Sequence, residues 1–429
     1  MSDFAQRIFE ELPLTTGESR LNRLREEGRI QFKTLGLPDK RVEEWKYTSL
    51  LALEQRKALP GADVADGKVT FMPEPMADIA VQLSLVNGDL SDISGEPVDG
   101  VRIQSLHSAL EESPESIFPM LESLEIAKRG QGFSALNNAT LGPGVVIHVA
   151  ANVDAGELLL QWNCSDQVEQ TLLNSRVLLI LEDGAKLHLI EQFENRSEDT
   201  SIFNVVVQSK LGTEAELVHT RFQHQSASSI LINRTEVSQA DSSRLHFTAL
   251  DLGSGLTRHD VKSKLQGTGA SCHLNGACVG SGHSHVDHHL YADHVAGDCQ
   301  SSQLFRAVAM DRSRIVFNGK VHVFKGADGS EAKQSSAGLL LSKLAEIDAK
   351  PELEIYADEV IANHGATVGQ LDDKALFYLQ SRGLNLVQAT NLLTMAFCRS
   401  VTDQLPSIVL REVLGERLSS ALNGVVDNV

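Results

Sequence analysis

A cluster of histidines is the feature of the sequence most suited to chemistry. The chain has 15 histidines, and five of them fall within residues 283–294, with Cys299 five residues further on. Successive side chains of a strand point to opposite faces, which predicts one shared face for His283, His285, Asp287 and His289. His288 would take the other face. Imidazoles and a carboxylate suit zinc or ferrous iron, so this segment is a candidate metal site.

A second explanation of the cluster stays open. The spacing between His283 and His294 matches no standard metal motif. The same residues suit a ladder of polar side chains on a solvated or interface face of a β array. The first interpretation predicts a stand-alone metalloprotein, and the second predicts a structural surface.

The cysteines do not form a recognisable site. Cys272 and Cys278 lie six residues apart, which is neither a zinc-ribbon nor a ferredoxin spacing, and two thiolates cannot hold an iron–sulfur cluster alone. The odd number and wide scatter predict free thiols in a reducing compartment. Buried small hydrophobic side chains are the alternative to a metal role. The five cysteines are Cys164, Cys272, Cys278, Cys299 and Cys398.

Residues 353–383 are the most distinctive stretch. Their first half alternates like a pair of strands, and Asp372 or Asp373 is expected to cap a following helix. His364 precedes Gly365, which predicts an accessible histidine at or near a turn, and imidazole is the side chain that titrates near neutrality. A turn histidine that makes only local hydrogen bonds is the alternative.

Charge and missing motifs exclude several classes of function. The net charge of −19 disfavours binding to nucleic acid or to an anionic membrane surface. The sequence has no phosphate-binding glycine loop of either standard type and no nucleophile elbow. No apolar run approaches the roughly 20 residues that cross a bilayer, and the first residues do not resemble a secretion signal. We therefore expect a cytoplasmic protein whose partners are neither nucleic acid nor membrane.

The spacing of apolar residues predicts three regions that must position these side chains. Residues 1–100 are expected to form a helical domain and a linker, because helical spacing gives way to frequent Gly, Pro and Asp after about residue 55. Residues 101–370 are expected to form a β core, after a short helical stretch. In residues 371–429 the helical period returns, which predicts a C-terminal helical domain.

The β core contains a weak internal repeat. A turn followed by one alternating strand recurs at spacings of 30, 28 and 27 residues, at Leu187, Leu217, Leu245 and Cys272. A near-constant period in this range predicts a stacked solenoid or a propeller-like array, and each unit fits one or two rungs of a β-helix. Chance echoes in a long β protein are the alternative.

The chain resembles the SufB/SufD family of the Suf iron–sulfur cluster assembly system over most of its length. Gly365 after His364 is more similar to the SufD branch than to the SufB branch, as is the element at residues 44–48. One departure is Ala362, where some members of the SufD branch have cysteine. The resemblance is carried by Arg41, residues 44–48, Phe133, residues 135–137, Arg258, Asp260, Asp287, His294, Cys299, Ser301, Gln303, Phe317, Gly319, residues 339–342 and, above all, residues 351–383.

The resemblance implies a mainly β fold: a right-handed parallel β-helix core flanked by N-terminal and C-terminal α-helical domains. It also implies a SufB-like subunit paired with the core. A SufC-like ATPase would dock on the C-terminal domain and supply the nucleotide motif that this sequence lacks. The helix expected from Leu384 to Val401 would contact the ATPase. Its contact residues would be Leu384, Val387, Leu392, Met395 and Phe397.

The implied site is shared between subunits. His364 would be a transient metal ligand near the seam with the SufB-like subunit, and with Ala362 in place of cysteine the thiolates must come from that partner. Iron or a nascent cluster would be held briefly, with no permanently bound cofactor. The expected function is a non-catalytic scaffold that assists iron entry and cluster assembly. A stand-alone metalloprotein, a purely structural partner, and a homodimer of the isolated chain stay open.

Overall fold

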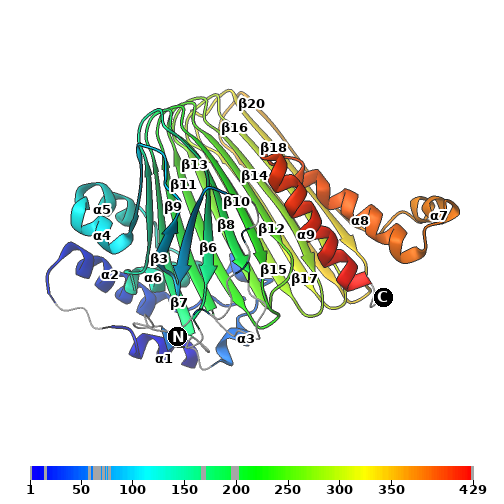
Figure 1. The fold of residues 1–429 in the computed structure, drawn as a ribbon, viewed down its shortest axis with the longest axis horizontal. Helices are drawn as coiled ribbons and strands as arrows, with labels where there is room; N and C mark the ends of the chain where they lie inside the picture. The colour runs from blue at the N-terminus through cyan, green and yellow to red at the C-terminus, as the bar shows by residue number, and fades with distance from the viewer. Residues whose placement is uncertain are drawn as a thin grey trace.

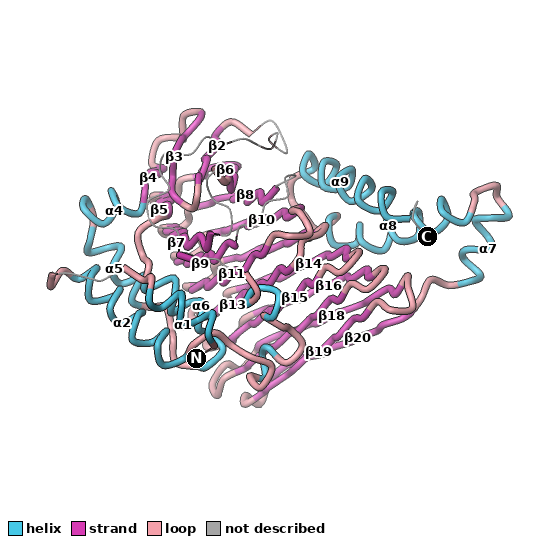
Figure 2. The backbone as a smooth tube through the Cα atoms, turned by 90° about the horizontal axis from the view of Figure 1, so that it is seen from below, coloured by secondary structure: helices cyan, strands magenta, loops and turns pink. Residues whose placement is uncertain are grey.

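The computed structural model describes residues 2–13, 17–56, 59–60, 69, 73, 75, 79–165, 171–194 and 202–426. A flattened stack of strands forms its centre, with N-terminal helices at one end and C-terminal helices at the other (Figures 1 and 2). The described helices are α1 (Asp3–Glu10), α2 (Arg20–Leu35), η1 (Glu43–Trp45), α3 (Leu51–Glu54), α4 (Leu106–Glu112), α5 (Pro114–Glu122), η2 (Arg129–Gln131), α6 (Gly132–Ala139), α7 (Asp373–Ser381), α8 (Leu386–Thr402) and α9 (Ile408–Val426).

Among the described residues the strands form two ten-stranded sheets. The first sheet contains β1 (Leu59–Pro60), β4 (Val101–Ser105), β5 (Gly144–Val149), β7 (Thr171–Leu181), β9 (Ile202–Leu211), β11 (Ile230–Gln239), β13 (Leu256–Leu265), β15 (His285–His294), β17 (Arg314–Val323) and β19 (Glu346–Ile355). The second sheet contains β2 (Val81–Val86), β3 (Asp89–Ser94), β6 (Asp154–Asn163), β8 (Lys186–Glu194), β10 (Glu216–His224), β12 (Arg244–Asp251), β14 (Ser271–Gly280), β16 (Gln300–Ala309), β18 (Ser330–Leu340) and β20 (Val360–Gly369).

Each rung of this solenoid adds one strand to each sheet, and neighbouring rungs pair in parallel. The positions that the sequence repeat marks as equivalent are paired. Leu217 aligns with Leu187 and with Leu245, and Leu245 aligns with Cys272. One repeat is therefore one rung of two strands. The predicted parallel β-solenoid with flanking helices is confirmed.

Alternating side chains fill the space between the sheets. In β17, Phe317 points inward and is fully buried, and its ring stacks on Phe305 of β16 with 4.5 Å between the ring centroids. Two residues further on, the inward position is Gly319, where a Cβ atom would come within 2.6 Å of the Phe317 ring. Burial of such apolar side chains supplies most of the free energy that drives folding, at about 25 cal/mol for each Å² of apolar surface removed from water.

The N-terminal helices cover the outer face of the first sheet. Phe4, Ile8, Phe32 and Phe133 form one buried cluster with residues of that sheet such as Ile230. The expected helical character holds for the described residues up to the end of α3. Of the expected linker, residues 55–100, the parts 57–58, 61–68, 70–72, 74 and 76–78 lie outside the described residues. The segment that follows is β2 and β3, which belong to the second sheet.

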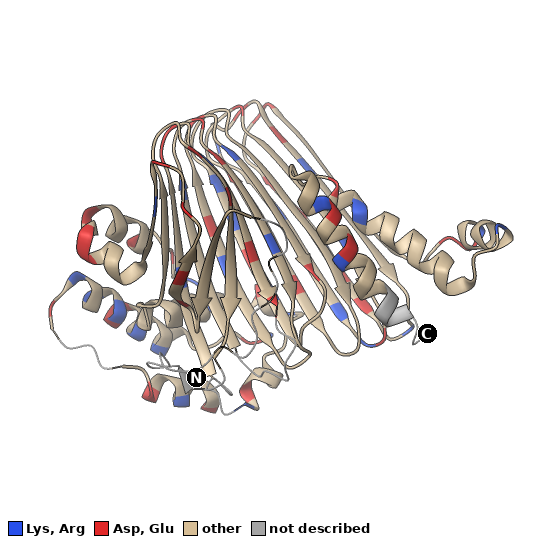
Figure 3. Cartoon of the chain, viewed as in Figure 1, with Lys and Arg blue, Asp and Glu red and all other residues tan. Residues whose placement is uncertain are grey.

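The C-terminal helices α8 and α9 pack on the outer face of the second sheet (Figure 1). Four leucines of α9 are buried there (Leu410, Leu414, Leu418 and Leu422), while its charged residues, marked in Figure 3, include the exposed Glu412 and Glu416. Helix α7 projects away from the body, and none of its residues is buried (Figure 2). None of the described helices combines the length and the apolar character needed to cross a membrane.

Two helix boundaries in this domain test the sequence prediction. Asp372 is the residue that caps α7, through a hydrogen bond from the Lys374 amide. The helix expected to begin at Leu384 begins at Leu386. The reason is that Asn385 and Gln388 form a capping box, in which each side chain accepts a hydrogen bond from the other residue's amide.

Candidate interface at the open end of the solenoid

The last rung leaves one sheet edge uncovered. β20 is the terminal strand of the second sheet, and β18 is its partner among the described strands. Almost all of its residues are exposed. A strand in this position presents a row of unpaired backbone N–H and C=O groups to solvent, and such a row is a template for pairing with another strand.

The two ends of the second sheet are built differently. At the opposite end, β3 turns back antiparallel to β2 and carries the carboxylates of Asp89 and Asp92, which discourage pairing with another chain. β20 contains no charged residue. Its Ile361 and Val368 side chains are 63% and 44% exposed. The β20 end of the sheet, which we call the open end, therefore lacks the charged side chains that protect the β3 end, the closed end.

His364 lies in the middle of β20, so its predicted place at a turn is wrong. The strand runs from Val360 to Gly369 in register with β18, and this long-range pairing overrides the local turn preference of Asn363 and Gly365. His364 pairs with Gln334, whose side chain points into the solenoid. Because no further rung covers that face, the His364 side chain is exposed.

A polar ladder leads from the interior to His364. Gln303, Gln334 and His364 occupy successive register positions in β16, β18 and β20. Gln334 Nε2 donates to Gln303 Oε1 at 3.1 Å, and Gln303 Nε2 donates to the Leu290 carbonyl at 3.1 Å. Ala362 shares the inward face of β20 and is half-buried against the core. The ladder places one imidazole at the mouth of the solenoid, with no thiol beside it in β20.

The five predicted ATPase contacts do not share one free surface. Val387, Met395 and Phe397 are partly buried against a cluster that the second sheet forms with the C-terminal helices. Leu392 is half exposed, and Leu384 is half-buried in the connection before α8. Phe377, Tyr378 and Leu386 are among the large exposed apolar side chains of this domain that sequence reasoning missed. They lie in α7 and at the start of α8, while Ile408 and Val409 are similarly exposed at the start of α9.

The histidines of β15 divide between two faces, as alternation predicts. His285 and His289 point outward with Asp287, and His288 points inward. His283 does not join the outward face, because it lies in the exposed turn before β15. The histidines of residues 283–294 therefore do not converge on one point.

The outward group anchors the N-terminal segment. Thr48 donates to Asp287 Oδ2 at 2.5 Å, and its hydroxyl lies 2.9 Å from His285 Nε2. Arg258 also donates to Asp287, at 2.5 Å, and its guanidinium lies 3.9 Å from the centre of the Trp45 ring. Burial alone would raise the pKa of Asp287, but Arg258, His289 and His285 together outweigh burial and lower it. A cavity of about 370 Å³ beside this seam is lined by side chains of both charges.

A fully buried ionic group, which sequence reasoning missed, lies further along the interior. Arg221 Nε donates to Glu191 Oε2 at 2.9 Å, and His219 Nε2 lies 2.6 Å from the same oxygen. Burial alone would raise the pKa of Glu191, yet Arg221 and His219 lower it to about 2. The sequence does contain a sign of this buried group. Glu191 takes the inward position between Leu189 and Phe193 on an alternating strand, where an apolar residue would be expected.

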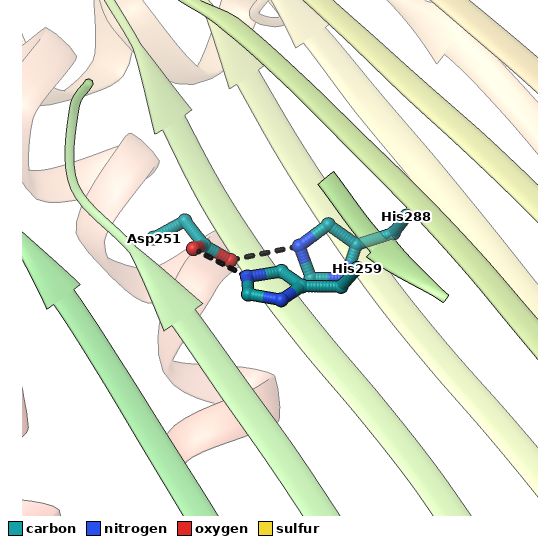
Figure 4. Close-up of side chains that lie close together, drawn as sticks. All are labelled: Asp251, His259 and His288. Atoms are coloured by element: carbon teal, nitrogen blue, oxygen red, sulfur yellow. Dashed lines mark hydrogen bonds and ion pairs between the residues drawn. The ribbon is translucent and has the colours of Figure 1, made fainter. Parts of the chain in front are cut away.

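The second inward group joins Asp251, His259 and His288 (Figure 4). His259 Nε2 lies 3.0 Å from Asp251 Oδ1, and His288 Nε2 lies 2.7 Å from Asp251 Oδ2. Of the predicted histidine cluster, His288 alone belongs to this group. Sequence reasoning missed the other two members, since they come from different rungs.

All the cysteines except Cys164 are buried, and all five are free thiols. Burial raises the pKa of Cys272 and of Cys398 to about 12, so these thiols stay protonated at neutral pH. The interpretation of Cys272 as a small buried hydrophobic residue fits this environment.

His294 makes the fold sensitive to acid. Its side chain points inward, with Nε2 2.7 Å from Ser301 Oγ. Burial lowers the pKa of His294 to about 4, and the nearby Asp293 offsets only part of that effect. At pH values between the folded and unfolded pKa values, the unfolded chain binds a proton at this position that the folded chain does not.

We expect this difference to destabilise the fold as the pH falls. Since histidine in an unfolded chain titrates near 6.5, the contribution of His294 to the free energy of unfolding should drop by about 1.4 kcal/mol per pH unit between that value and about 4. Replacing His294 by glutamine should flatten the slope by a similar amount. Urea unfolding followed by circular dichroism at pH 7, 6 and 5 measures it. The same slope in His294→Gln as in the exposed control His283→Gln would contradict the assignment.

Comparison with known proteins identifies the family. Residues 163–397, more than half of the chain, match the model described as "SUF system FeS cluster assembly, SufBD core domain". The chain belongs to the SufB/SufD family. It is 28% identical over 399 residues to the iron–sulfur cluster assembly protein SufD of Escherichia coli K12, covering 92% of this chain and 91% of that one.

Two further relatives agree with this assignment. An iron–sulfur cluster assembly SufBD family protein of Synechocystis is 29% identical over 405 residues, covering 90% of this chain and 88% of that one. SufD of Bacillus subtilis is 26% identical over 275 residues, covering 64% and 63%. The SufB/SufD core match runs from the end of β6 into α8. It therefore includes the open rung, His364 and α7.

Proposed function

We propose that this SufB/SufD protein is a non-catalytic scaffold subunit of an iron–sulfur cluster assembly complex. The observation that carries the proposal is the uncharged, uncovered strand β20 with His364 at its centre. A SufB-like subunit would pair with this edge and bury the exposed Ile361 side chain. An isolated chain could pair with its own copy through the same edge. We expect the complex to be cytoplasmic.

β20 suits strand pairing better than its neighbour β19 does. β19 contains Pro351, which has no N–H to donate, and its charged side chains are already engaged. Asp348 pairs with Arg314 at 2.7 Å and Glu354 pairs with Lys320 at 2.7 Å. A partner strand on β20 would meet neither obstacle.

The C-terminal domain offers the surface for a SufC-like ATPase. Phe377 and Tyr378 of α7 are 72% and 56% exposed, and Leu386 at the start of α8 is 56% exposed. Large exposed apolar side chains on neighbouring helices suit a docking surface. Hydrolysis in the ATPase would then move α7 and α8, and the movement would shift the interface at β20 between two states.

Iron or a nascent cluster is cargo at this interface. His364 supplies one imidazole, and a cluster needs further ligands, which are usually thiolates. Because Ala362 replaces the cysteine, the partner subunit must supply them. The site is then complete only while the two chains are in contact, which makes its occupation transient.

Replacing His364 by alanine should impair cluster maturation without harming the fold. The side chain is exposed, so the free energy of unfolding should change by less than about 0.5 kcal/mol. Activity of a cluster-dependent enzyme in cells that rely on this protein measures maturation, and the exposed His283→Ala is the matched control. Normal maturation in His364→Ala would exclude a metal role for this residue.

A purely structural partner is the second candidate function, and Ala362 favours it. Such a subunit would hold the ATPase and stabilise the SufB-like chain without touching iron. It predicts that His364→Ala matures clusters normally, whereas disruption of the β20 edge abolishes maturation.

A further inference from the structure

The interior of the solenoid holds a group of metal-binding side chains that the proposed function does not use. The ligand atoms of Asp251, His259 and His288 all lie within 4.8 Å of one another (Figure 4). Cys278 of β14 adds a sulfur atom, with its Sγ 3.9 Å from Asp251 Oδ2. All four side chains are fully buried, and they come from four different strands.

The charges of this group do not balance while both imidazoles are neutral. The buried Asp251 carboxylate contacts His259 and His288, and the guanidinium of Arg221, 3.4 Å from His259 Nδ1, is already paired with Glu191. Burial of a charge without an opposite charge is expensive, by several kcal/mol. A bound cation would balance the carboxylate.

We propose that Asp251, His259, His288 and Cys278 bind one zinc ion inside the solenoid. A carboxylate oxygen, two imidazole nitrogens and a thiolate sulfur are ligands that zinc prefers, and four of them close a structural site. Zinc bonds of about 2.0–2.3 Å place neighbouring tetrahedral ligands about 3.3–3.7 Å apart. From Asp251 Oδ2, the present separations of 2.7 Å to His288 Nε2 and 3.9 Å to Cys278 Sγ lie within about an ångström of these values. Cys278 Sγ must also move toward the two imidazoles, because only Asp251, His259 and His288 have ligand atoms that all lie within 4.8 Å of one another.

The protons and charges balance on binding. The Cys278 thiol releases its proton to solvent, and each imidazole moves its proton from Nε2 to Nδ1 to free a lone pair. The two positive charges of zinc then match the Asp251 carboxylate and the Cys278 thiolate. The proton on His259 Nδ1 then faces a second donor, Arg221 Nη1, at 3.4 Å, so this contact must lengthen while Nη1 keeps its acceptor, Asn233 Oδ1, at 2.7 Å. Because the site lies in the core, zinc must enter while the rungs form.

Zinc content of the full-length protein tests the proposal. Protein produced in zinc-supplemented medium and dialysed against EDTA should retain about one zinc per chain by mass spectrometry. Cys278→Ser and Asp251→Asn should lose it. Cys272→Ser, another fully buried cysteine of β14, should keep it. His364→Ala should also keep it, which separates this site from the proposed interface. Wild-type protein with no more zinc than Asp251→Asn would overturn the proposal and leave a hydrogen-bonded network only.

A spectroscopic measurement tests the same ligand set in variants that fold poorly. Protein produced with cobalt in place of zinc should show a sulfur-to-cobalt charge-transfer band in the wild type and in Cys272→Ser. The band should be absent from Cys278→Ser. Absence of the band from folded wild-type protein, or its persistence in Cys278→Ser, would contradict the ligand set.

Discussion

Replacing Arg221 by methionine is expected to lower the free energy of unfolding by about 3–5 kcal/mol. Arg221 and Glu191 are both fully buried between the sheets, and the guanidinium neutralises the carboxylate. Methionine fills similar space but carries no charge, so Glu191 would keep His219 as a neighbour and lose its guanidinium partner. The expected cost is that of a buried carboxylate with incomplete compensation.

Two comparisons isolate this effect, both by urea unfolding followed by circular dichroism. Arg244→Met removes a guanidinium from an ion pair with Glu216 that is partly exposed, and its expected cost is no more than about 1 kcal/mol. The double variant Glu191→Gln with Arg221→Met should recover much of the loss, because it removes both charges together. An equal loss in the free energy of unfolding for Arg221→Met and Arg244→Met would show that the buried ion pair stabilises the fold no more than the partly exposed one.

Replacing Ile361 by aspartate is expected to weaken binding of a SufB-like partner by at least about 30-fold, the equivalent of about 2 kcal/mol. Ile361 is the most exposed aliphatic side chain of β20, and a partner strand on this edge would bury it. A carboxylate would have to be desolvated in the same place. Because the side chain is free in the isolated chain, the fold itself should be unaffected.

The closed end of the same sheet supplies the control. Ile93 of β3 is 38% exposed and belongs to the strand at the opposite edge. Co-expression with SufB-like and SufC-like subunits, followed by size-exclusion chromatography with light scattering, compares the two variants. Ile93→Asp should assemble normally, and Ile361→Asp should not. If the pattern is reversed, the partner binds the closed end.

The repeat and the flanking helices could be predicted because local patterns determine them. Leu187, Leu217 and Leu245 stand at one position of successive rungs, so a near-constant spacing in sequence becomes a register in space. Alternation in β15 correctly separated His288 from His285 and Asp287. Such features can be predicted because they depend only on how regularly apolar and polar side chains are spaced along the chain.

The features that the sequence did not reveal depend on contacts between distant rungs. His364 has turn-forming neighbours, yet pairing with β18 places it in a strand. Asp251 and His288 are 37 residues apart and meet only because two rungs stack. The predicted contact residues Met395 and Phe397 follow from the family resemblance, but both pack against a buried cluster that the second sheet forms with the C-terminal helices.

Hydrogen exchange of the β20 amides tests the docking edge most directly. In the isolated chain, kept monomeric by dilution, the amides of residues 360–369 that do not donate to β18 should exchange fast. In the complex with a SufB-like subunit they should become protected, while the edge amides of β3 stay unprotected. Protection of another surface, with exchange in β20 unchanged, would contradict the assignment of β20 as the pairing strand.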